Sequence, residues 1–295
     1  MTGFSSDVAF SRTLGWVTEE EARILADRRV AIAGVGGVGG HYCEVLARLG
    51  VRKFRIEDPD TFDVVNFNRQ NGSGLSSIGR KKVDVLRERI LDINPDAEVE
   101  AVADRVTPEN LDAFLKDVDL YLDGLDFFAL LIRNHLFGRC RELGIPAITV
   151  APIGMGAALL VFTRDSMSFQ DYFGISPEAS REENAIRFLA GLAPTLIQRH
   201  YTVDRSRMNF AEQRVSSTPI GGYLCGGVAG ATALKLLLGR GEVPVAPVSL
   251  HYDAYLNTYK IRRVFFGWRN PLQRLKIAVI RMLIGSKSPK SPQNG

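Results

Sequence analysis

Short apolar runs alternate with segments of helical apolar spacing through the first half of the chain. The first pair is the run Val30–Ala33 and a helical pattern that ends at Leu49, where Gly50 closes the helix. The strands predicted in this way are 30–33, 54–56, 98–102, 120–122 and 147–150, and the helices are 19–27, 41–49, 79–94, 108–115 and 128–143. Such alternation predicts a mostly parallel sheet with helices on its faces.

The rhythm changes in the second half. A strand at 156–162 should leave the parallel set, and a polar, irregular crossover region with one helical stretch near 182–192 should follow at 164–217. We then expect a core helix at 221–238 and a two-stranded ribbon formed by 248–252 and 259–264. The predicted fold is therefore α/β, a Rossmann-like, mostly parallel sheet wrapped by helices with an antiparallel C-terminal extension. We expect one domain, 1–266, with an N-terminal arm, 1–29, followed by a basic tail, 267–295.

Composition is that of a globular protein with a slight basic excess. Of 295 residues, 45% are hydrophobic and 24% charged, which allows a sizeable buried core. The formal charge of +4 suits an anionic ligand such as a nucleotide. It is too small and too dispersed to predict a nucleic-acid partner.

The cysteine pattern indicates a reducing compartment. Cys43, Cys140 and Cys225 are an odd set without paired spacing, which argues against a disulfide framework, and no CxxC pair exists for a four-cysteine zinc site. The N-terminal residues lack a signal-peptide pattern, and no apolar run approaches the roughly 20 residues that cross a bilayer. We therefore expect a cytoplasmic protein.

A glycine-rich segment, Gly34–Gly40, joins the strand 30–33 to the helix that follows. Strand, tight loop and helix N-terminus form an anion site, because backbone N–H groups point at phosphate and glycine admits close approach. Gly34, Gly36 and Gly39 satisfy G-x-G-x-x-G, and an acid about 20 residues on, here Asp58, should bind a ribose hydroxyl. This signal predicts a nucleotide and fits NAD as well as ATP. A glycine turn needed only for packing is the alternative.

The polar segment after Asp58 favours ATP. Arg69 and Lys82 are cations placed to reach triphosphate oxygens. Asp123 and Asp126 follow the fourth strand, at the sheet edge where ligands bind, and a carboxylate there can hold Mg²⁺ beside phosphates. Each residue also has an ordinary explanation as a solvated lysine, an ion-paired arginine or a helix-capping aspartate. As a set they predict a triphosphate site.

With these residues in place, the chain resembles the ThiF/MoeB-type adenylyltransferases, bacterial relatives of ubiquitin-activating enzymes. The resemblance runs from about Ser11 to Gly239. Its motifs are Gly34-Val-Gly-Gly-Val-Gly, Asp58-x-Asp-x-Phe, Asn66-Phe-Asn-Arg-Gln, Gly79-Arg-Lys-Lys and Leu122-Asp-Gly-Leu-Asp. That family adenylates a C-terminal carboxylate, typically of a ubiquitin-like protein, and releases pyrophosphate.

The resemblance implies a role for each matching residue. Contacts with ATP would come from the glycine loop and from the polar residues of the motifs, namely Gly34, Gly36, Gly37, Gly39, Asp58, Asp60, Asn66, Arg69, Gln70, Lys82 and Asp123. Asp126 would be the essential acid, linked to Mg²⁺ through the nucleotide phosphates. Arg12 would reach the ATP site of the other subunit in a symmetric homodimer. The implied catalytic set is Asp126, Arg69, Lys82 and Arg12.

The chain departs from the family pattern in three places. It lacks the two CxxC pairs that often bind zinc, so no zinc is expected. The region 164–217 has no cysteine to accept an acyl group, and Cys225 falls in the predicted core helix, where a buried apolar role outweighs a nucleophilic one. Adenylation without a thioester step is therefore expected. Two extra residues separate Asp126 from Arg133, which weakens any role for Arg133.

The tail mixes basic and apolar residues. One helical face could hold Leu272, Leu275, Val279, Met282 and Leu283, while the remaining apolar positions are Ile277, Ile280 and Ile284. The first set predicts a weak membrane-surface contact, and the second makes packing on the domain or a dimer an equal alternative. The leading hypothesis is an ATP-dependent adenylyltransferase acting on a carboxylate of a small protein, peptide or metabolite. A NAD-dependent oxidoreductase and a non-catalytic scaffold subunit are the alternatives.

Overall fold

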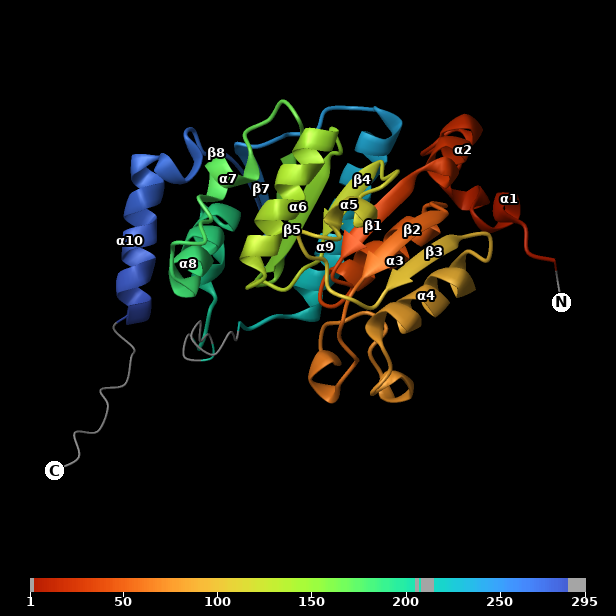
Figure 1. Cartoon of the computed structure of the whole chain (residues 1–295), viewed down its shortest axis with the longest axis horizontal. Helices are drawn as coiled ribbons and strands as arrows, with labels where there is room; N and C mark the ends of the chain where they lie inside the picture. Colours follow the sequence, from red (N-terminus) through yellow and green to blue (C-terminus); the bar gives the residue numbers. More distant parts are fainter. Residues whose placement is uncertain (1–2, 205–206, 208–214, 286–295) are drawn as a thin grey trace.

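An eight-stranded sheet organises the described part of the chain (Figure 1). The computed structural model describes residues 3–204, 207 and 215–285, with side chains of the last helix described as far as Met282. The strand order is β3-β2-β1-β4-β5-β6-β7-β8. The strands are β1 (Arg29–Ala33), β2 (Lys53–Glu57), β3 (Glu98–Val102), β4 (Leu120–Asp123), β5 (Ala147–Ile153), β6 (Gly156–Phe162), β7 (Val248–Asp253) and β8 (Thr258–Arg263).

The pairing confirms the predicted fold class. The strands β1 to β5 pair in parallel, and β6, β7 and β8 extend the sheet in antiparallel pairs. In register, Ala33 lies beside Glu57 on one side and Asp123 on the other. The carboxyl ends of β1, β2 and β4 therefore meet at one edge of the sheet, where the glycine loop begins.

Helices cover both faces of this sheet. They are α1 (Ser6–Ala9), α2 (Glu19–Asp27), α3 (Gly39–Arg48), α4 (Lys82–Ile93), α5 (Leu111–Phe114), α6 (Leu130–Leu143), α7 (Phe169–Phe173), α8 (Arg181–Leu192), α9 (Pro219–Leu238) and α10 (Pro271–Gly285), with short 3-10 turns η1 (Ser11–Thr13), η2 (Val64–Asn66), η3 (Leu75–Ser77), η4 (Ile197–His200) and η6 (Gly267–Arg269). The predicted N-cap of α2 is confirmed, because Thr18 and Glu21 form a reciprocal capping box.

Three helices begin later than predicted. α4 starts at Lys82 rather than Gly79, because Gly79 has φ +76° and belongs to the preceding turn. α6 starts at Leu130 rather than Phe128, because Asp126 Oδ1 accepts the Phe128 N–H at 2.9 Å and closes a separate turn first. α5 is likewise shorter than predicted.

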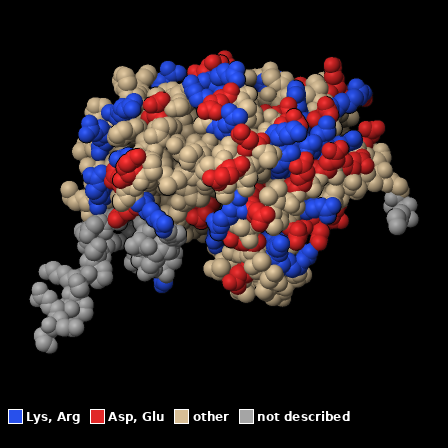
Figure 2. Space-filling model, viewed as in Figure 1, with Lys and Arg blue, Asp and Glu red and all other residues tan. Residues whose placement is uncertain are grey.

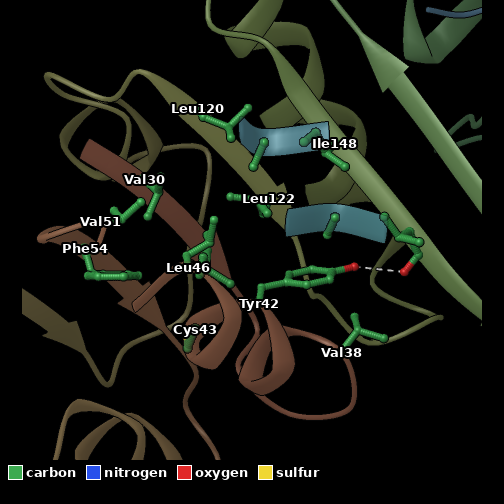
Figure 3. Close-up of a cluster of buried hydrophobic side chains, with 14 of the residues drawn as sticks. Val30, Val38, Tyr42, Cys43, Leu46, Val51, Phe54, Leu120, Leu122 and Ile148 are labelled. Atoms are coloured by element: carbon green, nitrogen blue, oxygen red, sulfur yellow. Dashed lines mark hydrogen bonds between the residues drawn. The ribbon is translucent and has the colours of Figure 1, made fainter. Parts of the chain in front are cut away.

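Alternating side chains along the strands supply two apolar cores. Ile32 of β1 packs with α3, α4 and α9 on one face, and its neighbour Ala31 packs with α5, α6, α7 and α8 on the other. Figure 3 shows the first core, where the Tyr42 hydroxyl of α3 donates to Val150 O at 2.9 Å. This contact fixes α3 against the sheet, and with it the loop at the start of α3.

The crossover region 164–217 is more ordered than predicted. The helix near 182–192 is confirmed as α8. The expectation of polar, irregular chain is wrong for α7, whose Phe169, Tyr172 and Phe173 are buried in the second core. A helix of five residues is too short to show helical periodicity in the sequence.

Among the described residues, α9 is the one helix long and apolar enough to cross a membrane by length and composition. This corrects the expectation that no apolar run approaches that length. Half of its most apolar window is buried, and a Cβ at Gly230 would lie 2.4 Å from the Val45 side chain of α3. The small residues of α9 thus allow close helix packing, as predicted for a core helix.

Candidate functional site

The glycine loop packs tightly on the turn that follows β4. Gly34 has φ +79°, and its N–H donates to Glu57 O at 2.7 Å. A Cβ at Gly34 would lie 2.3 Å from Gly124 O, and one at Gly39 would lie 1.8 Å from Gly34 O. Gly34 and Gly39 are therefore required for packing, which is the ordinary explanation of two glycines in the motif.

Gly37 is different, because a Cβ added there would meet no described atom within 4 Å. Next to it, Gly36 lies close to Gln70, whose buried Oε1 has no hydrogen-bond partner among the described residues. α3 begins at Gly39, and Val38 at its N-cap gives no side-chain hydrogen bond. The open space and the uncapped helix N-terminus, whose free N–H groups are donors, together fit a bound phosphate group. Gln70 Oε1 is an acceptor and does not itself favour an anion.

Asp58 and Lys82 adjoin this loop. Asp58 Oδ2 accepts the Val35 N–H at 3.0 Å, and Oδ1 accepts the Asp60 N–H at 3.0 Å. Lys82 Nζ lies 3.1 Å from Asp60 Oδ2 and 3.7 Å from Asp58 Oδ1. Burial raises the pKa of Asp58, although the charge of Lys82 opposes the rise. The glycine loop 34–37 and the predicted positions 58, 60 and 82 are thus brought together.

The loop after β2 also carries Asn66 and Arg69. Asn66 Oδ1 accepts the Asp63 N–H at 2.9 Å, so Asn66 shapes the turn η2. The Arg69 guanidinium donates to Val65 O at 3.0 Å and to Asn68 Oδ1 at 2.9 Å. Arg69 therefore folds back on its own loop through Nη1, and its remaining N–H groups are the donors that could meet a phosphate.

Asp123 and Asp126 have opposite environments. Asp123 is buried, with Oδ2 accepting from Arg133 Nε at 2.8 Å and Oδ1 accepting from Leu125 N at 3.3 Å. Asp126 is exposed, and its Oδ1 accepts the Phe128 N–H. Only Asp126 keeps a carboxylate open to a ligand, whereas Asp123 belongs to a buried ion pair.

Arg133 holds the turn that carries Asp126. Its Nη2 donates to Leu125 O at 2.8 Å and to Asp126 O at 3.0 Å. Its guanidinium carbon also lies 4.7 Å from the ring centroid of Phe188 in α8. The two extra residues between Asp126 and Arg133 weakened the role expected for Arg133. In the fold, the first turn of α6 nevertheless brings Arg133 back to the end of β4, where its guanidinium positions the turn.

Arg12 lies away from the glycine loop. It belongs to η1 on the N-terminal arm, between Phe10 and Thr13, which line a cleft of about 530 Å³ with Arg52 and Lys53 at the amino end of β2. Figure 1 shows α1 and α2 at the opposite edge from the loop that follows β2. One copy of the chain therefore does not bring Arg12 to the site, and its proposed role needs a second copy.

The sequence motifs did not predict two polar groups at the carboxyl edge of the parallel strands, Glu57 and Tyr201. Glu57 is buried, and burial together with the charge of Asp58 raises the pKa of Glu57 to about 7. The Tyr201 hydroxyl donates to Asp253 Oδ2 at 2.6 Å and accepts the Met155 N–H at 2.8 Å. Tyr201 thereby ties the crossover region to β7 and to the turn between β5 and β6.

The cysteines are unsuited to acyl transfer. Cys43, Cys140 and Cys225 are buried free thiols, and burial raises the pKa of each. The described residues contain no cluster of three or more His, Cys, Asp or Glu side chains placed to hold a metal ion. The buried Cys225 is thus a packing residue of α9.

An open phosphate cradle at the carboxyl edge of a mostly parallel sheet, with an acid and a lysine beside it, defines a Rossmann-type nucleotide-binding protein. The chain belongs to the ThiF family, whose model matches residues 10–271.

Three relatives illustrate the range of the family. The tRNA threonylcarbamoyladenosine dehydratase of Bacillus subtilis is 39% identical over 150 residues, 50% of this chain and 57% of that protein. The molybdopterin-synthase adenylyltransferase of Escherichia coli is 28% identical over 247 residues, 84% of this chain and 86% of that protein. The Escherichia coli sulfur carrier protein ThiS adenylyltransferase is 33% identical over 139 residues, 47% and 55% of the two chains. The chain spans about half the length of the dehydratases it matches.

Solved structures share the fold. PaaA superposes with a TM-score of 0.66 at 16% identity, covering 89% of this chain and 76% of PaaA. Escherichia coli MccB bound to ATP gives a TM-score of 0.63 at 16% identity, covering 86% and 69%. The fold of most of this chain is thus also found in a protein whose structure was solved with ATP.

Proposed function

We propose that this chain is an ATP-dependent adenylyltransferase that converts a carboxylate into an acyl-adenylate and releases pyrophosphate. The observation that carries the proposal is the open space at Gly37 together with the exposed carboxylate of Asp126, on a turn that packs against the same loop. A dehydrogenase has no need of the two cations Arg69 and Lys82. Membership of the ThiF family, with relatives named as adenylyltransferases, supports the same chemistry.

The proposed reaction needs charge compensation rather than a general base. A carboxylate is already ionised at pH 7, so its oxygen can attack the α-phosphorus of ATP while the bond to the leaving pyrophosphate breaks. Lys82 and Arg69 would offset the charge on the pyrophosphate, and the amides of the glycine loop would donate to the phosphates. Removing one such group is expected to slow the reaction about 10²–10³-fold.

Mg²⁺ would neutralise phosphate charge when bound. Asp126 is the residue proposed to hold it through the nucleotide, since its carboxylate is exposed and its backbone is fixed by Arg133. Asp58 would bind the ribose, because each of its oxygens, although engaged with a backbone N–H, has a second lone pair for a hydroxyl. Asn66 and Gln70 would support the phosphate-binding loop.

The acceptor is proposed to be the C-terminal carboxylate of a small protein or peptide. The match to the molybdopterin-synthase adenylyltransferase spans most of both chains, whereas the match to the tRNA dehydratases spans about half of each. A metabolite carboxylate is the alternative. We also propose a cytoplasmic homodimer without zinc, in which Arg12 of each copy completes the site of the other, and a peripheral membrane contact through α10.

Nucleotide-dependent thermal stabilisation tests the site directly. Mg²⁺–ATP should raise the melting temperature of the wild-type chain more than NAD does. Gly37→Ala should leave the free protein as stable as wild type, because the added Cβ meets open space, and should lose most of the shift produced by ATP. Gly227→Ala on α9, where a Cβ is equally free, is the matched control and should keep the full shift.

Two outcomes would count against the site. A shift with NAD alone would favour the oxidoreductase. An undiminished ATP shift in Gly37→Ala would mean that phosphate does not occupy the space beside this residue.

A further inference from the structure

α10 lies on the outside of the molecule and buries one of its faces. Ile277 and Ile280 pack with Ile186 and Ala190 of α8, and Gln273 on the same side is buried. Figure 1 shows α10 beside α8 at the end of the molecule away from the N-terminal arm. The predicted packing of these two isoleucines on the domain is therefore found.

The opposite face of α10 is an apolar stripe that no element of the described residues covers. Leu272, Leu275, Val279 and Met282 have exposed fractions between 45% and 72%. Their spacing of three, four and three residues aligns them along the helix. The predicted set also included Leu283, whose side chain, like that of Ile284, lies outside the described residues. We call these four residues the outer stripe.

Cations flank the outer stripe. At about 100° per residue, Arg274 and Arg281 fall on one side of it and Lys276 on the other. Arg281 also pairs with Glu183 at 2.7 Å, and Lys276 Nζ donates to Pro194 O at 2.6 Å. Arg274 has no ion-pair partner among the described residues. Figure 2 shows Lys and Arg atoms over the end of the molecule where α10 lies.

The sequence around α10 is uniformly cationic. From Ala254 to Gly295 it contains no Asp or Glu. Over the same span the cations are Lys260, Arg262, Arg263, Arg269, Arg274, Lys276, Arg281, Lys287 and Lys290. On α10 itself the exposed Arg274 lies beside the outer stripe, and this pair of features is complementary to a partner that is apolar and anionic at once.

The turn before α10 fixes the helix on the body. A Cβ at Gly267 would lie 2.1 Å from Asp171 O, and one at Gly174 would lie 2.5 Å from Trp268 Cγ. Arg187 stacks over the Trp268 ring at 4.8 Å. Trp268 is thus a docking residue and not part of an exposed contact, and the outer stripe is held in a defined orientation.

Two aromatic side chains enlarge the apolar surface at the start of α10. Phe265 and Phe266 are both exposed in the turn between β8 and η6. Phe266 adopts φ +64°, a left-handed conformation that is unfavourable for a bulky residue. A strained turn that presents rings to solvent is a feature of functional segments rather than of packing.

We infer that α10, with Phe265 and Phe266, is a contact site for an anionic membrane surface. Aliphatic and aromatic side chains can enter the boundary between headgroups and acyl chains, while Arg274 and Lys276 meet anionic headgroups. A nucleic acid would use the cations but leave the outer stripe in water. An anionic membrane surface would contact both the cations and the outer stripe. The site is separate from the glycine loop, so it does not depend on the proposed adenylation.

Vesicle sedimentation of the full chain tests this inference. Binding to vesicles of phosphatidylcholine mixed with phosphatidylglycerol should exceed binding to phosphatidylcholine alone by at least about tenfold and should weaken with added salt. Leu275→Glu/Val279→Glu should reduce the binding by at least about tenfold, because two charges replace the centre of the outer stripe.

The control is Leu143→Glu on α6, a leucine with 43% exposure against 45% for Val279, which should bind vesicles like the wild type. All variants should keep the melting temperature and circular dichroism spectrum of the wild type, which shows that they are folded. Absence of vesicle binding, or undiminished binding by Leu275→Glu/Val279→Glu, overturns the inference. Binding of tRNA that the same double variant retains, without vesicle binding, would assign the surface to nucleic acid instead.

Discussion

The parallel and antiparallel halves of the sheet have different relations to the candidate chemistry. Around β1, β2 and β4, residues far apart in sequence converge on one loop, with Asp58 bonded to Val35 and the Asp126 turn packed on Gly34. Beside β6, β7 and β8, the crossover region packs through α7 and α8 into the second core, and Tyr201 bonds it to Asp253 of β7. The parallel half therefore holds the candidate nucleotide site, and the antiparallel half presents surfaces that could contact other molecules.

This difference suggests that the two halves of the sheet have separate functions. Because relatives with different names share the family, we expect the nucleotide site to be the common part and acceptor recognition to lie in the antiparallel half. Arg133 connects the two, because it pairs with Asp123 and also stacks on Phe188 of α8. The predictions below test whether activity belongs to the first half and whether this connection is structural.

The largest effect is expected for Asp126→Ala. ATP–pyrophosphate exchange should fall by more than about 10³-fold, because the proposed metal-linked acid is lost. The melting temperature should fall only slightly, because the exposed carboxylate contributes one hydrogen bond to the Phe128 N–H, a loss of about 1 kcal/mol. Asp165→Ala, another exposed aspartate, is the control and should exchange normally. Near-normal exchange by Asp126→Ala would remove the chemistry from the parallel half.

Asp123→Ala should act mainly on stability. Removing one partner of the buried pair leaves Arg133 uncompensated, which is expected to cost about 3–5 kcal/mol in urea unfolding. The double variant Asp123→Leu/Arg133→Met should recover part of this loss, because no unpaired buried charge remains. If Asp123→Ala unfolds like the wild type but loses exchange, Asp123 acts on the nucleotide itself.

Glu57 predicts a smaller, pH-dependent effect. Its folded-state pKa of about 7 lies above the unfolded value of 4.5, so the unfolded chain releases this proton first as the pH rises. Stability should therefore fall between about pH 4.5 and pH 7, by about 3 kcal/mol in total.

Glu57→Gln should remove this loss. Urea unfolding should show the variant more stable than wild type at pH 8 and similar to it below about pH 3.5, where both states hold the proton. An equal change at both pH values would show that the effect comes from packing rather than from ionisation.

Sequence patterns predict the parallel half well, because its strands and helices are long enough to show periodicity and its motifs follow successive strand ends. They do not separate Gly37, which faces open space, from Gly34 and Gly39, which pack on backbone. Nor do they reveal Arg133, since only the folded turn brings its guanidinium to Asp123. α7 is missed because five residues are too few for a periodic signal.

Carboxylate-dependent ATP–pyrophosphate exchange by the full wild-type chain tests the central proposal most directly. Screened against small proteins and peptides with free C-termini and against metabolite carboxylates, at least one should support incorporation of labelled pyrophosphate into ATP. Exchange should require both Mg²⁺ and that carboxylate. ATP binding without exchange for any acceptor would instead support a non-catalytic scaffold, and contradict an adenylyltransferase.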